Sequence, residues 1–228
     1  MKFAYKAIAI CLVGVMCVSA YHILEICLEY NKARTEYNKI REVAFEDDEI
    51  DWEALHKINP DIVAWISLED SNINYPVVKG DDNDFYLHRN AKKEQDSAGT
   101  PFIDCSVENE FEEFDTIIYG HNMKDGSMFS GLTKYIEKEG FYETHKQIEL
   151  ITQEGKYNIV VFAGFYTKAG SEIYDDEYVR EHINEIANLG DVEVTPGDKI
   201  VTLSTCAYVY EDARCVIVGK LEPERRKQ

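Results

Sequence analysis

The stretch VTLSTCAYVYEDARCVIVG, residues 201–219, decides how the C-terminal part of this chain folds. Two apolar, β-prone runs flank a loop of about seven residues, which predicts two neighbouring strands. Cys206 ends the first run and Arg214 begins the second, so both side chains are expected at one end of a sheet. A thiolate attacks carbonyl carbon, and a guanidinium can hydrogen-bond a carbonyl oxygen. Taken singly, a buried thiol and a surface arginine are the alternatives.

The same β-prone texture extends outward from this hairpin over the chain after Asn59-Pro60. Eight short strands of this kind predict a closed or nearly closed barrel, so the fold class is mainly β with peripheral helices. An amphipathic helix from Asp176 to Leu189, ended by Gly190, is expected between the sixth and seventh strands. The predicted strands are 63–67, 75–78, 100–104, 116–120, 147–152, 156–166, 199–203 and 214–221.

The N-terminal segment AIAICLVGVMCVSAYHILEICL, residues 7–28, is apolar enough and long enough to span a bilayer as a helix. Lys2 and Lys6 precede it without an acidic residue, so the N-terminus is expected on the cytoplasmic side and the folded domain outside the cell membrane. Signal-peptide cleavage after Ala20 is the alternative to an uncleaved, single-pass anchor.

Five segments follow from these patterns. Helix-forming residues with spaced apolar positions predict two helices before the barrel, broken by the acidic run 46–51. The expected segments are a cytoplasmic N-terminus at 1–6, a transmembrane anchor at 7–28, a helical extension at 29–58, a catalytic barrel domain at 59–221 and a charged tail at 222–228.

The charge of the chain is strongly acidic, with a formal net charge of -19. Such a surface repels nucleic acid and anionic lipid, so neither is expected as a partner. The acidic cluster at 81–84 lacks the ligand spacing of a calcium-binding loop, and no zinc spacing or phosphate-binding glycine loop is present. We therefore expect no metal site and no cofactor.

Three of the six cysteines lie outside the N-terminal segment, at Cys105, Cys206 and Cys215. The sequence allows a disulfide bond between Cys105 and Cys215. The alternative is that both are buried free thiols at strand positions.

A nucleophilic cysteine needs a proton acceptor or a cation close by, which is normally a histidine. Among the six histidines, His121 stands apart because the predicted strand before it delivers it to the mouth of a polar loop at 122–130. A structural role for this histidine is the alternative.

Several motifs together resemble the class B sortases, which are cell-wall transpeptidases of Gram-positive bacteria. TLSTC at 202–206 with Arg214 is similar to the cysteine and arginine signature of that family, and YGHNM at 119–123 to its histidine segment. The class B features are NPDIVAWI at 59–66, YPVV at 75–78 and DNDFYL at 82–87. The resemblance covers roughly residues 50–221. Ala207 departs from it, where many relatives are expected to carry a polar or acidic residue.

The resemblance implies an eight-stranded sortase-type β-barrel with a catalytic triad of His121, Cys206 and Arg214. Cys206 would attack the carbonyl of a threonine in a C-terminal sorting signal and form a thioacyl-enzyme. His121 would act as general acid and then as general base. Arg214 would hold the substrate backbone and stabilise the oxyanion. The expected partners are secreted proteins that bear a sorting signal, a peptidoglycan precursor amine and, through the N-terminal helix, the membrane.

Four further residues are predicted to bind substrate because they lie beside the triad: Ser204, Thr205, Tyr119 and Asn122. Local hydrogen bonding in strands and loops is the alternative for each. At the level of function, the alternatives are a pilin-polymerising or mainly hydrolytic sortase-like peptidase and a non-catalytic surface-binding domain.

Overall fold

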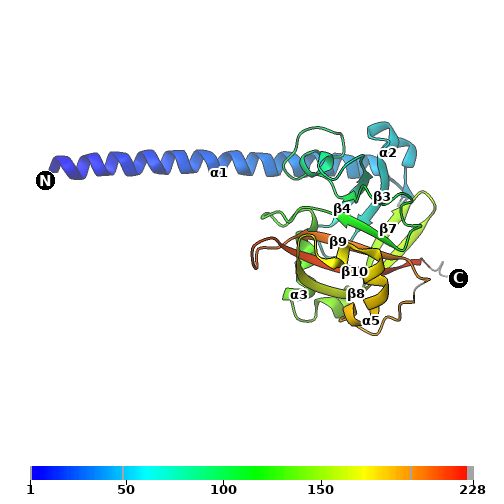
Figure 1. Cartoon of the computed structure of the whole chain (residues 1–228). Coiled ribbons are helices and arrows are strands. Elements are labelled where there is room, and N and C mark those ends of the chain that lie inside the picture. Colours follow the sequence, from blue (N-terminus) through cyan, green and yellow to red (C-terminus); the bar gives the residue numbers. More distant parts are fainter. Residues whose placement is uncertain (1, 48, 196, 225–228) are drawn as a thin grey trace.

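The computed structural model describes residues 2–47, 49–195 and 197–224 (Figure 1). The helices are α1 (Lys2–Ala44), α2 (Trp52–Ile58), α3 (Lys134–Glu137), α4 (Phe141–Thr144) and α5 (Asp176–Ile186), with short 3-10 helices at Phe85–His88, Phe129–Thr133 and Glu172–Tyr174. The strands are β1 (Phe45–Glu46), β2 (Glu49–Ile50), β3 (Ile62–Ser67), β4 (Asn74–Lys79), β5 (Phe102–Ile103), β6 (Asp115–Tyr119), β7 (Gln147–Thr152), β8 (Lys156–Lys168), β9 (Ile200–Cys206) and β10 (Ala213–Pro223).

Strands β3 to β10 form a closed barrel in the order β10-β8-β7-β3-β4-β5-β6-β9, which confirms the predicted eight-stranded fold. Most neighbouring strands are antiparallel, but β4 pairs with β5 and β6 pairs with β9 in parallel. Closure pairs the strands with one another and leaves no exposed sheet edge. The parallel β6 and β9 end at the same rim of the barrel, and this rim carries the site described below.

Two apolar clusters hold the barrel together. The larger cluster includes the fully buried side chains Trp65, Tyr86 and Phe129 and extends from the barrel strands to α1. Outside the barrel, α5 packs on the outer face of the sheet through Val179 and Ile183, which belong to the second cluster together with residues of β8, β9 and β10. The helix predicted between the sixth and seventh barrel strands is therefore confirmed.

This helix α5 ends at Ile186, so the predicted end at Gly190 is wrong. After Ala187 leaves the helical conformation, the chain docks on β8 instead. The Asn188 side chain accepts from the Gly164 N–H and donates to the Gly164 carbonyl, and these two bonds replace further helical ones. A side-chain amide that pairs with a strand distant in sequence has no signature in helical periodicity.

Helix α1 is continuous from the apolar segment through Ala44, so the first helix of the extension does not form a separate element. Its N-terminal part projects away from the barrel (Figure 1). The large apolar side chains described there, from Tyr5 to Leu28, are exposed. Its C-terminal part is buried against the barrel at Tyr37, Ile40 and Ala44. The acidic run then forms part of the small β1–β2 hairpin. One helix, within the described residues, is long and apolar enough to cross a membrane, and it lies near the N-terminus.

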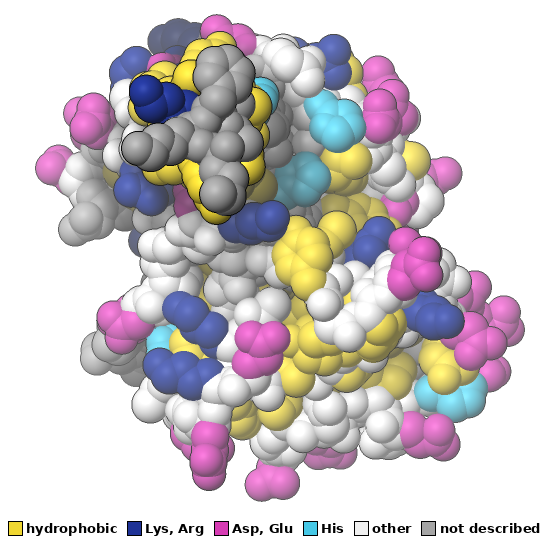
Figure 2. Space-filling model, turned by 90° about the vertical axis from the view of Figure 1, so that its left-hand side faces the viewer, with side chains coloured by type: hydrophobic (Ala, Val, Ile, Leu, Met, Phe, Trp, Pro, Cys, Tyr) yellow, Lys and Arg dark blue, Asp and Glu magenta, His cyan; other side chains and the backbone are white. Residues whose placement is uncertain are grey.

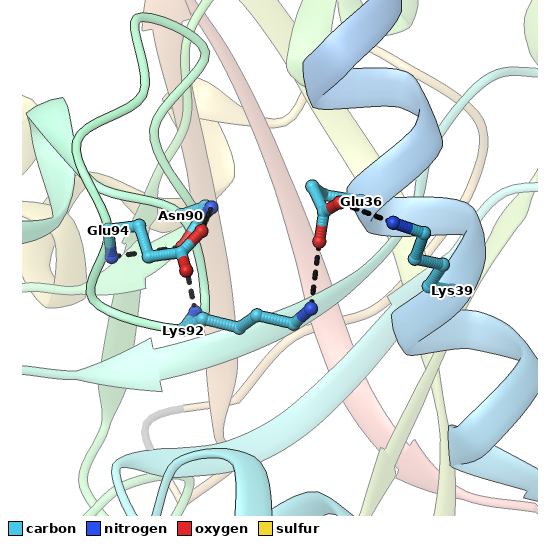
Figure 3. A network of polar contacts seen from close by, with 5 residues as sticks. All are labelled: Glu36, Lys39, Asn90, Lys92 and Glu94. Carbon is cyan, nitrogen blue, oxygen red and sulfur yellow. Dashed lines mark hydrogen bonds and ion pairs between the residues drawn. The ribbon is translucent and has the colours of Figure 1, made fainter.

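A polar network fastens α1 to the loop after the first 3-10 helix (Figure 3). Glu36 on α1 accepts from the Lys92 ammonium at 2.7 Å and from Lys39 at 2.7 Å. These bonds lower the pKa of Glu36 to about 2. The Lys92 backbone N–H in turn donates to Asn90 Oδ1 at 2.9 Å, and the Asn90 amide donates to Glu94. The helix and the loop are thus held at a fixed spacing.

Asp115, at the start of β6, predicts an unusual dependence of stability on pH. Its carboxyl group is buried and accepts a hydrogen bond from the Thr202 hydroxyl at 2.7 Å, and its second oxygen has no partner among the described residues. Burial raises its pKa to about 8. The folded state therefore binds this proton more tightly than the unfolded chain does, and the stabilisation, complete below about pH 4, is lost as the pH rises to about 8.

Asp115→Asn removes this titration. Between pH 5 and 8, the free energy of unfolding of the parent should fall relative to that of the variant, with a slope on the order of 1 kcal/mol per pH unit. Urea unfolding of both proteins in the same detergent, at several pH values, measures the difference. Parallel pH profiles would show that the Asp115 carboxyl titrates normally.

Candidate active site

Cys206 and Arg214 lie opposite each other on the paired strands β9 and β10. Directly paired residues of antiparallel strands project their side chains to the same face, with Cβ atoms about 5 Å apart. The predicted hairpin is confirmed, but β9 extends three residues beyond its predicted end and includes Cys206. The reason is that the Ala207 N–H donates to the Ala213 carbonyl at 2.9 Å, which continues the pairing past the cysteine.

His121 follows β6, whose parallel pairing with β9 brings it beside the cysteine. Tyr119 is in register with Ser204, and the Gly120 N–H donates to the Ser204 carbonyl at 3.1 Å. The Asn122 amide then donates to the Cys206 carbonyl at 2.8 Å. Two bonds thus tie the histidine segment to the cysteine strand on either side of His121.

The imidazole of His121 is held by one contact to the 3-10 helix Phe85–His88. Its Nε2 lies 2.8 Å from the Leu87 carbonyl oxygen. Because a carbonyl oxygen only accepts, Nε2 carries the proton in this bond. In the neutral ring Nδ1 is then the nitrogen without a proton, which is the one able to accept a proton from a thiol or an amine.

A cavity of about 420 Å³ opens at this rim of the barrel. It contains all three predicted triad residues, and three of the four predicted substrate-binding residues: Ser204, Thr205 and Tyr119. Asn122 does not line it, and its side chain binds the Cys206 carbonyl instead. The remaining lining residues are Asn83, Leu87, Phe102, Gly120, Ala169, Gly170 and Tyr174.

The polar groups in the wall of this cavity are largely buried. The Ser204 hydroxyl lies 2.9 Å from the Tyr174 hydroxyl. The Thr205 hydroxyl is buried, and within the described part of the chain it has no hydrogen-bond partner. Burial and the neighbouring Asp104 carboxylate raise the pKa of Tyr119, so its phenol stays protonated. The wall therefore offers neutral hydrogen-bonding groups and apolar surface, which suits a peptide backbone better than a charged ligand.

Arg214 supplies the positive charge of the cavity. Its Nη1 donates to the backbone carbonyl of Ala213 at 3.1 Å. Among the ion pairs of the described residues, none involves Arg214. A guanidinium has five N–H donors, so several remain for a bound carbonyl or carboxylate.

The three cysteines of the barrel region are all free, so the bridge between Cys105 and Cys215 is not formed. Cys215 is buried in β10, and burial raises its pKa to about 12. Cys105 is exposed in the turn after β5, so the expectation that it is buried in a strand is wrong. Cys206 is half-buried and faces the cavity. Of the three thiols, Cys206 alone is both reachable and next to a histidine.

Sequence reasoning missed Tyr174, Leu87 and Gly99 as contributors to this site. Tyr174 comes from a short 3-10 helix after β8, a position that only the fold brings to β9. Leu87 and Asn83 belong to the DNDFYL segment. Its similarity to class B sortases does not by itself indicate that these two residues line the cavity. Gly99 carries a signal of its own in principle, because glycine favours the left-handed backbone conformation that it adopts, with φ +60°.

Gly99 lies so close to Leu87 and His121 that no side chain fits between them. A Cβ at this position would lie 2.7 Å from the Leu87 carbonyl oxygen and 3.2 Å from the imidazole of His121. Gly99→Ala should therefore displace the carbonyl that holds His121 and lower kcat by about tenfold or more, with a smaller change in KM. Steady-state kinetics measure this. Gly140→Ala is the matched control, since its φ of +77° is also positive, nothing described lies within 4 Å of the added Cβ, and it does not line the cavity.

A barrel that brings a cysteine, a histidine and an arginine to one cavity at its rim is the architecture of an acyl-transferring cysteine enzyme. The family model of the sortase domain matches residues 66–222 of this chain. The chain therefore belongs to the sortase family, and its relatives place it among the class B sortases, which are cysteine transpeptidases.

The similarity to class B sortases extends over most of the chain. Sortase B of Listeria monocytogenes is 39% identical over 178 residues, which cover 73% of this chain and 72% of that protein. Sortase B of Staphylococcus aureus is 32% identical, with 97% of this chain and 98% of that protein covered. The solved Staphylococcus aureus sortase B–substrate complex superposes with a TM-score of 0.75 at 32% identity, over 87% of this chain and all of that one.

Proposed function

We propose that this chain cleaves a C-terminal sorting signal after a threonine and transfers the protein to an amine of a peptidoglycan precursor. In the first half-reaction the Cys206 sulfur bonds to the threonine carbonyl carbon, and the bond from that carbon to the next nitrogen breaks. His121 takes the proton of the Cys206 thiol on Nδ1 and donates it to the departing amine. The product is a thioacyl-enzyme. The observation that carries this proposal is the common cavity of His121, Cys206 and Arg214.

In the second half-reaction the incoming amine attacks the thioester carbonyl. His121 accepts a proton from this amine, the carbon–sulfur bond breaks, and Cys206 is released for another turnover. The Nε2–H bond from His121 to the Leu87 carbonyl supports this role, because it orients the ring with Nδ1 free for both transfers.

Arg214 is assigned to the substrate carbonyl groups and to the oxyanion of each tetrahedral intermediate. Its position opposite Cys206 and its unpaired guanidinium donors support this role. Ser204, Thr205 and Tyr119 are assigned to the substrate groove because all three line the cavity of Cys206. Asn122 acts on the backbone of Cys206 rather than on substrate.

We further propose that α1 anchors the enzyme as an uncleaved, single-pass helix with residues 1–6 in the cytoplasm and the barrel on the outer side of the cell membrane. The long apolar helix and the lysines that precede it support this arrangement. Secreted proteins and wall precursors are then within reach of the barrel.

Transfer to an amine separates this function from simple hydrolysis. We expect the enzyme, given a sorting-signal peptide and an oligoglycine or diamino-acid amine, to form a ligated product. Its mass should equal that of the hydrolysed peptide plus that of the amine, minus one water. Mass spectrometry follows both products. Hydrolysed peptide alone, over a series of such amines, would favour a mainly hydrolytic peptidase, and no cleavage would favour a surface-binding domain. Cys206→Ala is the control for background cleavage.

A further inference from the structure

The loop between β9 and β10 presents an unusual apolar surface. Tyr208, Val209 and Tyr210 are 73%, 52% and 44% exposed. Across the described ranges 45–47, 49–195 and 197–224, these are the only large hydrophobic side chains that are strongly exposed, and they are consecutive. Soluble proteins seldom expose such a cluster without a partner.

The anchor helix places this end of the barrel close to the membrane. Tyr30 and Arg34 on α1 line a second cavity, of about 410 Å³, together with Met123 and Asp125 from the segment after His121. Arg34 lies 3.9 Å from Asp125. At 1.5 Å per residue, Arg34 is only about 9 Å along the helix from residue 28, where the apolar segment ends. The interfacial layer of a leaflet is itself about 5–8 Å thick.

The β9–β10 tip is joined to the same segment. The Tyr208 hydroxyl donates to the Asn122 carbonyl at 3.2 Å, which leaves Val209 and Tyr210 at the apex. In Figure 1 the loop between β9 and β10 projects from the barrel toward the N-terminal end of α1. Figure 2, seen from that side, shows hydrophobic side chains gathered on the face of the barrel below the end of α1.

We infer that Tyr208, Val209 and Tyr210 dock on the lipid–water interface of the membrane that holds α1. The inference rests on the proposed anchor and goes beyond it, since an anchor alone leaves the barrel free to tilt. Tyrosine is one of the two residues enriched at this interface, where its ring is apolar and its hydroxyl stays wet. Because Glu211 and Asp212 follow the aromatic residues, the contact does not depend on anionic lipid.

This second contact has a consequence for the cavity. Cys206 and Arg214 lie at the two ends of the loop that carries the tip. With α1 and the tip both held, the barrel has two points of attachment and the active-site rim keeps a fixed height at the membrane surface. The active site then meets its substrate close to the point where the substrate leaves the bilayer.

Depth-dependent fluorescence quenching tests the inference in the full chain. Val209→Trp is reconstituted in phosphatidylcholine vesicles with and without lipid brominated near the ester end of its acyl chains. Emission is read as the difference from the parent, which contains Trp52 and Trp65. We expect the bromolipid to reduce the emission of the tip tryptophan by roughly twofold or more, because the tip reaches the interface. Tyr210→Trp provides a second probe of the same apex.

Two control variants separate the possible results. Met16→Trp lies inside the apolar segment and reports on the anchor. Gln153→Trp is exposed in the turn between β7 and β8, at the opposite end of the barrel from the cysteine. Quenching of the anchor and tip probes, but not of Gln153→Trp, supports the inference. A quenched anchor probe with an unquenched tip overturns the inference and leaves the anchor intact. An unquenched anchor probe overturns both. Tip quenching that requires phosphatidylglycerol and is lost in salt also overturns it.

Discussion

Replacing Cys206 by alanine is expected to lower the cleavage rate of a fluorogenic sorting-signal peptide by at least about 10⁴-fold, because Cys206 is the proposed nucleophile and its removal abolishes the proposed covalent pathway. Only background hydrolysis should remain. The fold should persist, since Cys206 is half-buried and the pairing of β9 with β10 uses its backbone. Initial rates and a thermal unfolding curve, measured on the same preparation, distinguish loss of chemistry from loss of structure.

Cys105→Ala is the matched control for this experiment. Its thiol is exposed in a turn and lies outside the cavity, so most activity should be retained. Cys215→Ala is less informative because its side chain is buried in β10, where truncation also costs packing. Turnover by Cys206→Ala at a rate near that of the parent would remove the acyl-enzyme from the mechanism.

The same experiment can be extended to the reactivity of each thiol. A small alkylating reagent should modify Cys206 in the parent, and its adduct should block turnover. Cys215 should resist modification, because it is buried and its raised pKa keeps it protonated. Peptide mapping identifies the modified positions. Full activity after complete alkylation of Cys206 would contradict its role.

The barrel was predictable from sequence because each of its strands is a short β-prone run that can be recognised from local residues alone. Each of the eight predicted runs overlaps a barrel strand, and the run at 147–152 coincides with β7. The ends were less predictable. The Cys206 strand continues because of a cross-strand bond between Ala207 and Ala213, and α5 stops early because Asn188 binds β8. Both depend on partners distant in sequence, which neither propensity nor periodicity records.

For the candidate site too, local contacts were predictable from sequence and long-range contacts were not. Cys206 and Arg214 sit on one hairpin, so their proximity follows from the pairing of neighbouring strands. His121 joins them only because β6 pairs in parallel with β9, a long-range contact that the resemblance supplied and the spacing did not. The local neighbours of the triad were a weaker basis for prediction. Asn122 is adjacent to His121 in sequence, but its amide turns to the Cys206 carbonyl and away from the cavity.

Arg214→Lys is expected to reduce kcat/KM for the same peptide by about 100-fold, although the positive charge is kept. Lysine carries a single ammonium on a flexible stem, whereas guanidinium presents a planar set of donors. At this position Nη1 already donates to the Asp212 and Ala213 carbonyls, and the other guanidinium nitrogens can donate to substrate. The loss should appear mainly in kcat if the donors act on the oxyanion, and mainly in KM if they only hold the substrate backbone.

Arg180→Lys is the matched control, because this arginine on α5 stacks over Phe114, outside the cavity. It should leave the kinetics of the peptide unchanged. Whether Arg214→Lys changes kcat or KM also tests the proposal that Arg214 stabilises the oxyanion. A structural arginine would affect thermal stability first and the two kinetic constants little, so parent-like kinetics in Arg214→Lys would place this residue outside the catalytic machinery. A loss restricted to kcat would instead show that the guanidinium acts when negative charge develops beside Cys206.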